Sequence, residues 1–147
     1  MELKIKKFDE LTPRELYEII RARESIFLLE QNIVCQDLDR VDYRSLHFFL
    51  EDGGQVLAYM RAYVVEDGVA KIGRVLSMTH GIGLGTALMT GALPEIKKRL
   101  ECKKIMLHAQ SHAKEFYAGF GFVETSSEFM EEGVPHVEMT LRLKETN

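Results

Sequence analysis

Hydrophobic and polar residues follow two different rhythms along this chain of 147 residues. Short apolar runs bounded by Gly, Asp and Pro are typical of strands, whereas apolar residues spaced three or four apart indicate helices. The chain changes between these rhythms several times, without internal repeats or low-complexity segments. We therefore expect a mixed fold in which helices pack against a sheet.

A strand and a helical region are predicted at the start of the chain. Leu3–Ile5 begins the strand. Thr12-Pro13 suits a helix start, because Thr can accept a hydrogen bond from the first turn and Pro fits the first helical position. The apolar positions that follow at helical spacing are Leu16, Ile19 and Ile20. Ile26 to Glu30 is predicted as a second helical piece, and the acidic stretch Gln31 to Arg44 as a connecting loop.

Three strands joined by tight turns are predicted next. The turns are marked by Asp52-Gly53-Gly54 and by Asp67-Gly68, which are typical of β-hairpins. The predicted strands are Leu46 to Leu50, Val56 to Val65 and Val69 to Leu76. Consecutive strands joined in this way form an antiparallel meander.

The second half of the chain predicts a helix and then more strands. The helix begins near Gly83, and its apolar residues fall four apart: Leu84, Leu88, Ala92, Ile96 and Leu100. Pro94 removes a backbone donor inside it, so we expect a kink or break near residues 90–94. The later predicted elements are a strand Ile105 to Ala109, a helix Ala113 to Gly119, a strand from Phe122, an irregular loop through Gly133-Val134-Pro135 and a strand Val137 to Leu143.

Composition narrows the class of protein. A 46% hydrophobic content suffices for one core, so we expect a single domain over residues 1–147. The net charge of −4 argues against a nucleic-acid partner. Neither a membrane-spanning run nor a secretory signal is present in the sequence, so we expect a cytoplasmic protein. Cys35 and Cys102 are far apart and outside any metal-ligand spacing, so no metal is expected.

The segment His80-Gly81-Ile82-Gly83-Leu84-Gly85 carries the strongest chemical signal, because it links a predicted strand to a predicted helix. Glycine permits positive φ, so alternate glycines can direct several backbone N–H groups toward one point. The start of a helix adds free N–H groups and the positive end of its dipole, which together bind phosphate. The segment therefore predicts a phosphorylated cofactor.

Two familiar phosphate loops do not fit this segment. A P-loop needs Lys and then Ser or Thr after its last glycine, but Thr86 and Ala87 follow Gly85. A dinucleotide-binding unit places its glycines after a first strand, whereas several predicted strands precede them here. A glycine-rich turn without a ligand remains an alternative.

Two motifs, in this order of elements, resemble the GNAT superfamily of N-acetyltransferases over nearly the whole chain. The family's Gln/Arg-x-x-Gly-x-Gly/Ala is similar to residues 80–85, with His80 in first position. Its second motif, Asn-x-x-Ala-x-x-Phe/Leu-Tyr-x-x-Phe/Leu-Gly-Phe, is met by Gln110, Ala113, Phe116, Tyr117, Phe120, Gly121 and Phe122. Phe27-Leu28-Leu29-Glu30-Gln31, Asp37-Leu38-Asp39 and residues 131–139 resemble the ElaA-like branch in particular.

This resemblance implies an α/β (α+β mixed) fold, with a mostly antiparallel sheet and helices on both faces, that binds acetyl-CoA. In the family the glycine loop holds the pyrophosphate of acetyl-CoA, and the preceding strand pairs with the pantetheine arm. The implied cofactor site consists of Val75, Leu76, His80, Gly81, Ile82, Gly83, Leu84, Gly85, Thr86 and Gln110. Candidate acceptor-binding residues are Gln31, Asp37, Asp39, His112 and His136. Homodimers are frequent in the family, so the resemblance makes a homodimer possible, but the sequence does not fix the oligomeric state.

Acetyl transfer to an amine needs a neutral nucleophile and a proton for the departing thiolate. Tyr117 matches the family's general-acid position, although a purely structural core Tyr is the alternative. Glu30 is the first candidate for the general base, against the alternative of a solvated residue at a helix end. His108, His112 and His136 can also titrate near neutral pH, and structural roles remain open for each. The aspartates of the acidic loop form either an amine-attracting rim or hydrated surface.

These observations predict an N-acetyltransferase that moves the acetyl group of acetyl-CoA to a primary amine by direct attack in a ternary complex. The acceptor, a small molecule or a peptide, is not identified by the sequence. Two alternatives remain: a non-catalytic module that binds or senses acyl-CoA, and an acyltransferase that uses a longer acyl-CoA.

Overall fold

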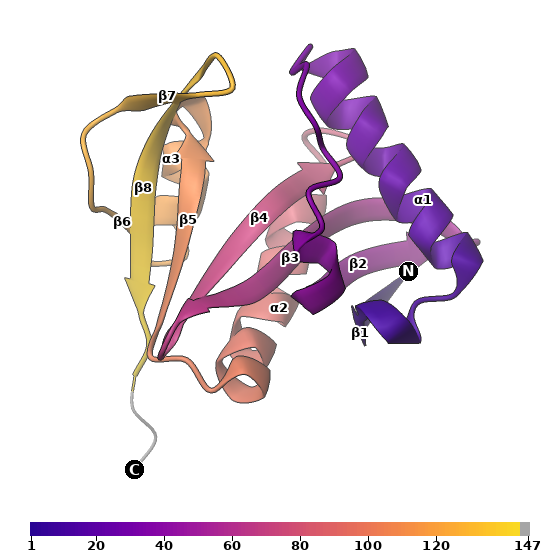
Figure 1. The fold of residues 1–147 in the computed structure, drawn as a ribbon, viewed down its shortest axis with the longest axis horizontal. Helices are drawn as coiled ribbons and strands as arrows, with labels where there is room; N and C mark the ends of the chain where they lie inside the picture. The colour runs from indigo at the N-terminus through magenta and orange to yellow at the C-terminus, as the bar shows by residue number, and fades with distance from the viewer. Residues whose placement is uncertain (145–147) are drawn as a thin grey trace.

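A computed structural model describes residues 1–144, so the last three residues of the predicted 1–147 domain lie outside it. The strands form one sheet in the order β1-β2-β3-β4-β5-β8-β6, and β7 also pairs with β8 (Figure 1). Their bounds are β1 Glu2–Lys7, β2 Leu46–Asp52, β3 Gln55–Glu66, β4 Val69–Ser77, β5 Lys104–Gln110, β6 Val123–Glu124, β7 Phe129–Glu131 and β8 Val134–Arg142.

Three α-helices accompany the sheet within the described residues: α1 Pro13–Arg23, α2 Leu84–Leu100 and α3 Lys114–Ala118. The predicted start of α1 is confirmed, because Thr12 Oγ1 accepts from Glu15 N at 3.1 Å and the Glu15 carboxylate accepts from Thr12 N at 2.9 Å. The helix runs directly into a π-helical segment, Glu24–Glu30. Short 3₁₀ turns lie at Phe8–Glu10, Val41–Arg44 and Ser111–Ala113. No helix in residues 1–144 is long and apolar enough to cross a membrane.

Helices cover both faces of the sheet, as predicted (Figure 1). Neighbouring residues of β2 point to opposite faces: Phe48 belongs to the core beneath α2, and Phe49 to the core beneath α1. Both side chains are fully buried. A strand buried on both faces is apolar at successive positions, which explains the run Phe48 to Leu50.

The sheet splits between β4 and β5. These two strands pair in parallel only from Val69↔Lys104 to Ile72↔Leu107. Beyond that point β4 stays paired with β3, for example Leu76 with Tyr59, while β5 stays paired with β8. The two arms diverge in Figure 1, and within residues 1–144 they leave one edge of β4 without a strand partner along residues 73–77.

A β-bulge in β4 lies at this split. Gly73 pairs with Arg61 and Leu76 with Tyr59, so Arg74 and Val75 together oppose the single residue Met60. Arg74 has a φ of 55°, a left-handed conformation that is unusual for a residue with a side chain. A bulge increases the local bend of a strand and leaves one residue out of the ladder. It therefore helps to direct β4 away from β5.

The structure corrects two predictions about local structure. Of the kink or break expected near residues 90–94, the break is excluded, because α2 is one continuous helix over residues 84–100 with Pro94 inside it. The carbonyl of Thr90, which loses its donor, is on an exposed residue where water can satisfy it. The predicted irregular loop at residues 133–135 is instead part of a β-hairpin, in which Glu131 pairs with Val134 around Glu132 and Gly133, both with positive φ.

Candidate active site

A cavity of about 470 Å³ occupies the split in the sheet. Its walls come from β4, β5, α3, the β7–β8 hairpin and the loop that follows the π-helical segment. Several residues predicted to form the site line it: Gln31, Asp37, Asp39, Val75, Gln110, His112, Tyr117 and His136. The structure therefore brings together residues that are far apart in the sequence.

The glycine loop lies between the end of β4 and the start of α2. Gly81 and Gly83 have φ values of 80° and 81°, and Gly83 is the N-cap residue of the helix. No side chain caps this end, and the first turn carries no acidic residue. Because Ala87 N is the donor to Gly83 O, the N–H groups of residues 84–86 precede the first intrahelical bond. This end of α2 is therefore suited to an anion.

Gly85 is a glycine for a different reason. A Cβ at this position would lie 3.2 Å from Cζ of Phe116 and 3.5 Å from Oγ of Ser77. The absence of a side chain lets α2 approach α3, which carries Tyr117. The glycine loop thus combines two backbone turns with one close packing contact.

His80 and Glu30 contact each other on the surface. His80 Nε2 lies 2.9 and 3.0 Å from the two carboxylate oxygens of Glu30, and both side chains are largely exposed. Glu30 does not line the cavity described above. This placement joins Glu30 to the glycine loop and does not support its predicted role as the general base.

Tyr117 reaches the cavity from the α2 side of the sheet. It is 8% exposed and packs edge-on against Phe116 and Phe122, with ring centroids 5.2 and 6.1 Å away. Burial raises the pKa of the phenol above its usual range. The hydroxyl therefore stays protonated at neutral pH, as a proton donor must.

A hydrogen bond crosses the open end of the split. Gln110 Nε2, at the end of β5, donates to Gln31 Oε1 at 3.0 Å. Gln31 follows the π-helical segment, so residues 30 and 31 contact both the glycine loop and β5. The predicted cofactor residue Gln110 and the predicted acceptor residue Gln31 thus lie together at the edge of the cavity.

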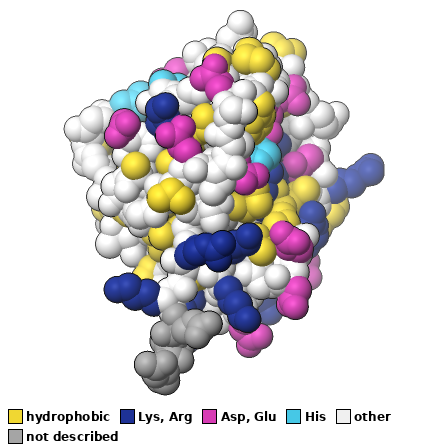
Figure 2. All heavy atoms as spheres, turned by 90° about the vertical axis from the view of Figure 1, so that its left-hand side faces the viewer, with side chains coloured by type: hydrophobic (Ala, Val, Ile, Leu, Met, Phe, Trp, Pro, Cys, Tyr) yellow, Lys and Arg dark blue, Asp and Glu magenta, His cyan; other side chains and the backbone are white. Residues whose placement is uncertain are grey.

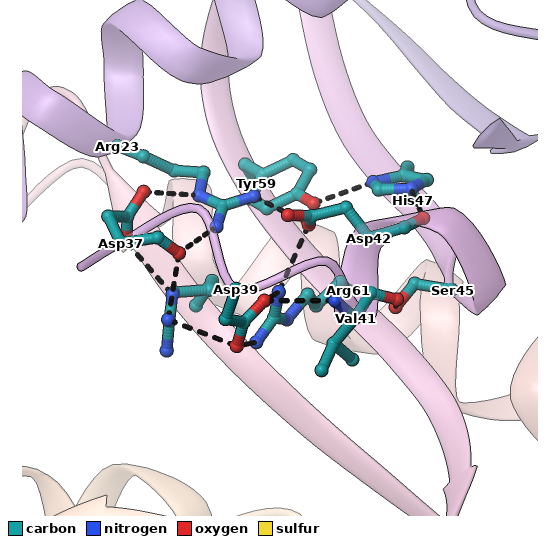
Figure 3. Close-up of polar contacts among 10 residues, drawn as sticks. Arg23, Asp37, Asp39, Val41, Asp42, Ser45, His47, Tyr59 and Arg61 are labelled. Carbon is teal, nitrogen blue, oxygen red and sulfur yellow. Dashed lines mark hydrogen bonds and ion pairs between the residues drawn. The ribbon is translucent and has the colours of Figure 1, made fainter.

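The predicted acidic loop is held by arginines. We define the arginine–aspartate cluster as Arg23, Asp37, Asp39, Asp42, Arg61 and Arg74 (Figure 3). Arg23, from α1, is 1% exposed and donates to Asp37 at 2.8 Å and to Asp42 at 2.6 Å. Arg61, from β3, donates to both oxygens of Asp39 at 2.7 and 2.8 Å. These contacts fix the loop onto the sheet.

All three aspartates pair with arginines, although only Asp42 is buried and Asp37 and Asp39 keep part of their surface exposed. Asp37 and Asp39 do line the cavity, but their charges face guanidinium groups. The cluster contains as many arginines as aspartates, so it offers no excess of negative charge to an ammonium ion. This placement does not support the amine-attracting rim predicted for Asp37 and Asp39.

Ion pairing in the cluster makes folding sensitive to acid. Burial alone would raise the pKa of Asp42, but the hydrogen bond and charge of Arg23 outweigh it, and the net shift is downward. Hydrogen bonds from Arg61 hold the pKa of Asp39 far below its usual range. Each folded pKa is lowered, so the stability it contributes is present above the unfolded value near 3.9 and is lost as pH falls below it.

We expect the free energy of unfolding in urea to be nearly constant between pH 7 and pH 5 and to fall steeply from about pH 4 downward. Asp42→Asn should cost about 3–5 kcal/mol at pH 7, because it leaves buried Arg23 without one partner. The same change at exposed Asp9 is the matched control and should cost less than about 0.5 kcal/mol. Equal losses for both variants would contradict this role of the cluster.

A second cluster of polar side chains in the cavity consists of His108, Glu131 and His136. His108 Nδ1 lies 2.9 Å from Oε1 of Glu131, and His136 Nε2 lies 3.6 Å from Oε2 of the same carboxylate. The sequence makes His108 and His136 candidate titrating groups, whereas it assigns no role to Glu131, although residues 131–139 resemble the ElaA-like branch. The contact of Glu131 with His108 depends on the β7–β8 hairpin, which the sequence did not predict. Figure 2 shows histidine side chains beside acidic and basic ones near the upper edge of the face that it presents.

Comparison with solved structures defines the class of protein. The chain is similar to an acyl-CoA N-acyltransferase from Pseudomonas aeruginosa, with a TM-score of 0.88 and 32% identity over 95% of this chain and 99% of that one. It is also similar to Escherichia coli ElaA, with a TM-score of 0.89 and 28% identity over 95% and 99% of the two chains. The fold is therefore that of the acyl-CoA-dependent acyltransferases.

Sequence comparison gives the family. The model of the acetyltransferase (GNAT) domain matches residues 22–143. A UPF0039 protein of Schizosaccharomyces pombe is 33% identical over 97% of this chain and 98% of its own length, and Escherichia coli ElaA is 31% identical over 88% and 89%. The chain belongs to the GNAT acetyltransferase family, and the predicted resemblance to the ElaA-like branch is confirmed.

Proposed function

We propose that this protein is an N-acetyltransferase that moves the acetyl group of acetyl-CoA to a primary amine by direct attack in a ternary complex. The observation that carries the proposal is the free edge of β4, which leads from the cavity toward the uncapped N-terminus of α2. A thioester with a phosphorylated end and an amide-containing arm fits these two features together. This proposal accounts for the glycine loop and the split sheet at once.

The free edge of β4 supports the position of the pantetheine arm. An unpaired strand edge presents N–H and C=O groups that an extended ligand can pair with, as an added strand does. Val75 and Leu76 lie on this edge, beside the bulge. The pyrophosphate would then lie at Gly81 to Thr86, where the N–H groups of the first turn of α2 are free.

The position of Tyr117 in the cavity wall and its protonated hydroxyl support its role toward the leaving sulfur. Its protonated hydroxyl lies in the wall of the cavity that the thioester would enter from β4. A phenol that donates a hydrogen bond to the leaving sulfur stabilises the thiolate as the C–S bond breaks. Because burial raises the pKa of this phenol, the hydroxyl keeps its proton in the resting protein and is available as a hydrogen-bond donor to the sulfur.

A thiol-release assay tests the proposal. The full chain is incubated with acetyl-CoA and a panel of primary amines, and we expect free thiol and the acetylated amine, identified by mass, to appear in equal amounts. Tight binding of coenzyme A by calorimetry, without thiol release for any amine, would instead favour a binding or sensing module. Faster turnover of propionyl- or succinyl-CoA than of acetyl-CoA would favour the longer-chain acyltransferase.

Cys35→Ser separates direct attack from a covalent intermediate. Cys35 lines the cavity, but desolvation and the charge of Glu132 raise the pKa of its thiol, so the thiolate nucleophile is disfavoured. We expect kcat within about twofold of the wild-type value, because no acyl-enzyme forms. Cys102→Ser, at a buried thiol outside the cavity, is the parallel variant and should also keep kcat. Complete loss in Cys35→Ser alone would require a ping-pong mechanism.

A further inference from the structure

The structure points to a specific group that removes the proton from the acceptor amine. We propose that His108 is the general base of the acceptor site, and that Glu131 is the positioning residue that sets its tautomer. This inference rests on the proposed function, which needs a neutral amine but leaves the base unassigned. Glu30, the base expected from sequence, lies outside the cavity, whereas His108, Glu131 and His136 all line it.

His108 and Glu131 have the geometry of a carboxylate–imidazole pair. A carboxylate can only accept, so the 2.9 Å contact requires that Nδ1 of His108 carries the proton. Nε2 is then the nitrogen with the free lone pair, which is the state that a general base needs. An orienting carboxylate on the opposite ring nitrogen is the same arrangement that activates histidine in other catalytic groups.

His136 lies on the other side of the Glu131 carboxylate. His136 Nδ1 donates to the carbonyl of Val134 at 2.7 Å, and its Nε2 lies 3.6 Å from Glu131 Oε2, which is an ion-pair contact only when the ring carries both protons. His136 is 7% exposed and stacks on Phe129, with ring centroids 6.1 Å apart. The ring of Phe129 also packs edge-on against His108 at 5.1 Å. The side chain of His108 is therefore held by two residues of β7, Glu131 and Phe129, while its backbone pairs with Glu138 of β8.

His108 also faces the part of the cavity where an acceptor would meet the thioester. It follows Leu107, the last residue of β5 that pairs with β4, so it lies where the two strands begin to separate. Gly73, Arg74 and Val75 of β4 line the same cavity on the other side of the split. An amine bound between these walls can approach both His108 and a thioester carbonyl on β4.

In the proposed transfer, the acceptor nitrogen loses two protons and the acetyl group moves from sulfur to nitrogen. The acceptor ammonium gives a proton to Nε2 of His108, and the neutral nitrogen forms a bond to the acetyl carbon as the C–S bond breaks. The thiolate takes a proton from Tyr117, and the second proton lost by the nitrogen restores that phenol. The proton on His108 then passes to water. No oxidant, metal or covalent enzyme intermediate is involved.

The first test reads the tautomer directly and does not need turnover. Nitrogen-15 spectra of histidine-labelled full chain should show His108 protonated on Nδ1 and free on Nε2. In Glu131→Gln this preference should weaken, because an amide can also donate to Nδ1. Glu124→Gln, at an exposed carboxylate outside the cavity, is the matched control and should leave the His108 signals unchanged. Protonation of His108 on Nε2 in the wild type would overturn the proposal.

The second test uses two acceptors that differ in basicity. His108→Gln should lower kcat/KM about 100-fold for an alkylamine from the panel, because that amine is protonated at neutral pH. For the analogue with three fluorines on the carbon next to the amine-bearing carbon, which is mostly neutral at neutral pH, the loss should stay within about threefold. A variant that is merely distorted would lose activity equally with both amines.

The outcomes separate this inference from the proposed function. An active wild type whose His108→Gln variant keeps full activity with the alkylamine would overturn the base and leave the acetyltransferase proposal intact. Equal losses with both amines would also overturn the base. A wild type that releases no thiol with any amine would overturn both. Calorimetry with coenzyme A on each variant confirms that the cofactor site is preserved.

Discussion

Gly83→Asp is expected to abolish the binding of coenzyme A while the protein stays folded. Gly83 has a φ of 81° and is the N-cap of α2, and a Cβ there would meet no atom within 4 Å. The new carboxylate therefore fits sterically but lies where the pyrophosphate should bind. Two unit charges about 4 Å apart near a protein surface repel by about 4 kcal/mol. We expect the dissociation constant from calorimetry to rise at least about 100-fold.

Gly53→Asp is the matched control for this variant. Gly53 also has a positive φ, of 57°, and open space around a Cβ, but it lies in the β2–β3 turn outside the glycine loop. Both variants should lose about 1 kcal/mol of stability, because each places a side chain in a left-handed conformation. Coenzyme A should bind Gly53→Asp with wild-type affinity. Wild-type affinity in Gly83→Asp would instead contradict the assignment of the phosphate site.

Tyr117→Phe is expected to lower kcat about 100-fold and leave the affinity for coenzyme A within about twofold. The variant removes one oxygen and keeps the ring that packs against Phe116 and Phe122. The loss should therefore appear in the chemical step, which single-turnover thiol release measures apart from binding.

A control isolates the loss of the hydroxyl at the reacting centre. Tyr17→Phe makes the same chemical change on an exposed residue of α1, so its kcat should not change. Thermal unfolding of both variants should resemble that of the wild type, since no hydrogen bond to the Tyr117 hydroxyl is present among residues 1–144. An unchanged kcat in Tyr117→Phe would remove this residue from the role of acid.

Much of the fold could be predicted because its signals are local. The β2–β3 and β3–β4 turns are marked by Asp-Gly pairs, and the apolar spacing of α2 is regular. Pro94 does not decide between a kink and a break from the sequence alone, and the helix continues because a single missing donor need not end it when the freed carbonyl can reach water. The last strand is predicted from residue 137 onward, but its earlier start and its pairing with β7 are not, because Pro135 lies inside β8. Proline is tolerated in a strand only where its missing N–H is not needed.

The site was predictable only where one segment contains it. The glycine loop is contiguous, and its positive φ values at Gly81 and Gly83 follow from the residue type. The side-chain contacts that shape the acceptor side of the cavity join residues that are far apart in the sequence: Arg23 with Asp42, and His108 with Glu131. A single sequence gives the types of these residues but not their partners. The roles predicted for Glu30 and the aspartates could therefore not take into account their contacts with His80 and with the arginines.

The arginine–aspartate cluster also indicates where acceptor preference can be altered in the laboratory. Every aspartate in residues 31–44 forms an ion pair with an arginine. Because randomising that loop would break these pairs, we expect it to yield mainly unfolded variants. The turn at Glu132 and Gly133 is exposed, and Glu132 borders the cavity. A library confined to this turn, with His108 and Glu131 kept, should retain more folded members and more diverse substrate choice.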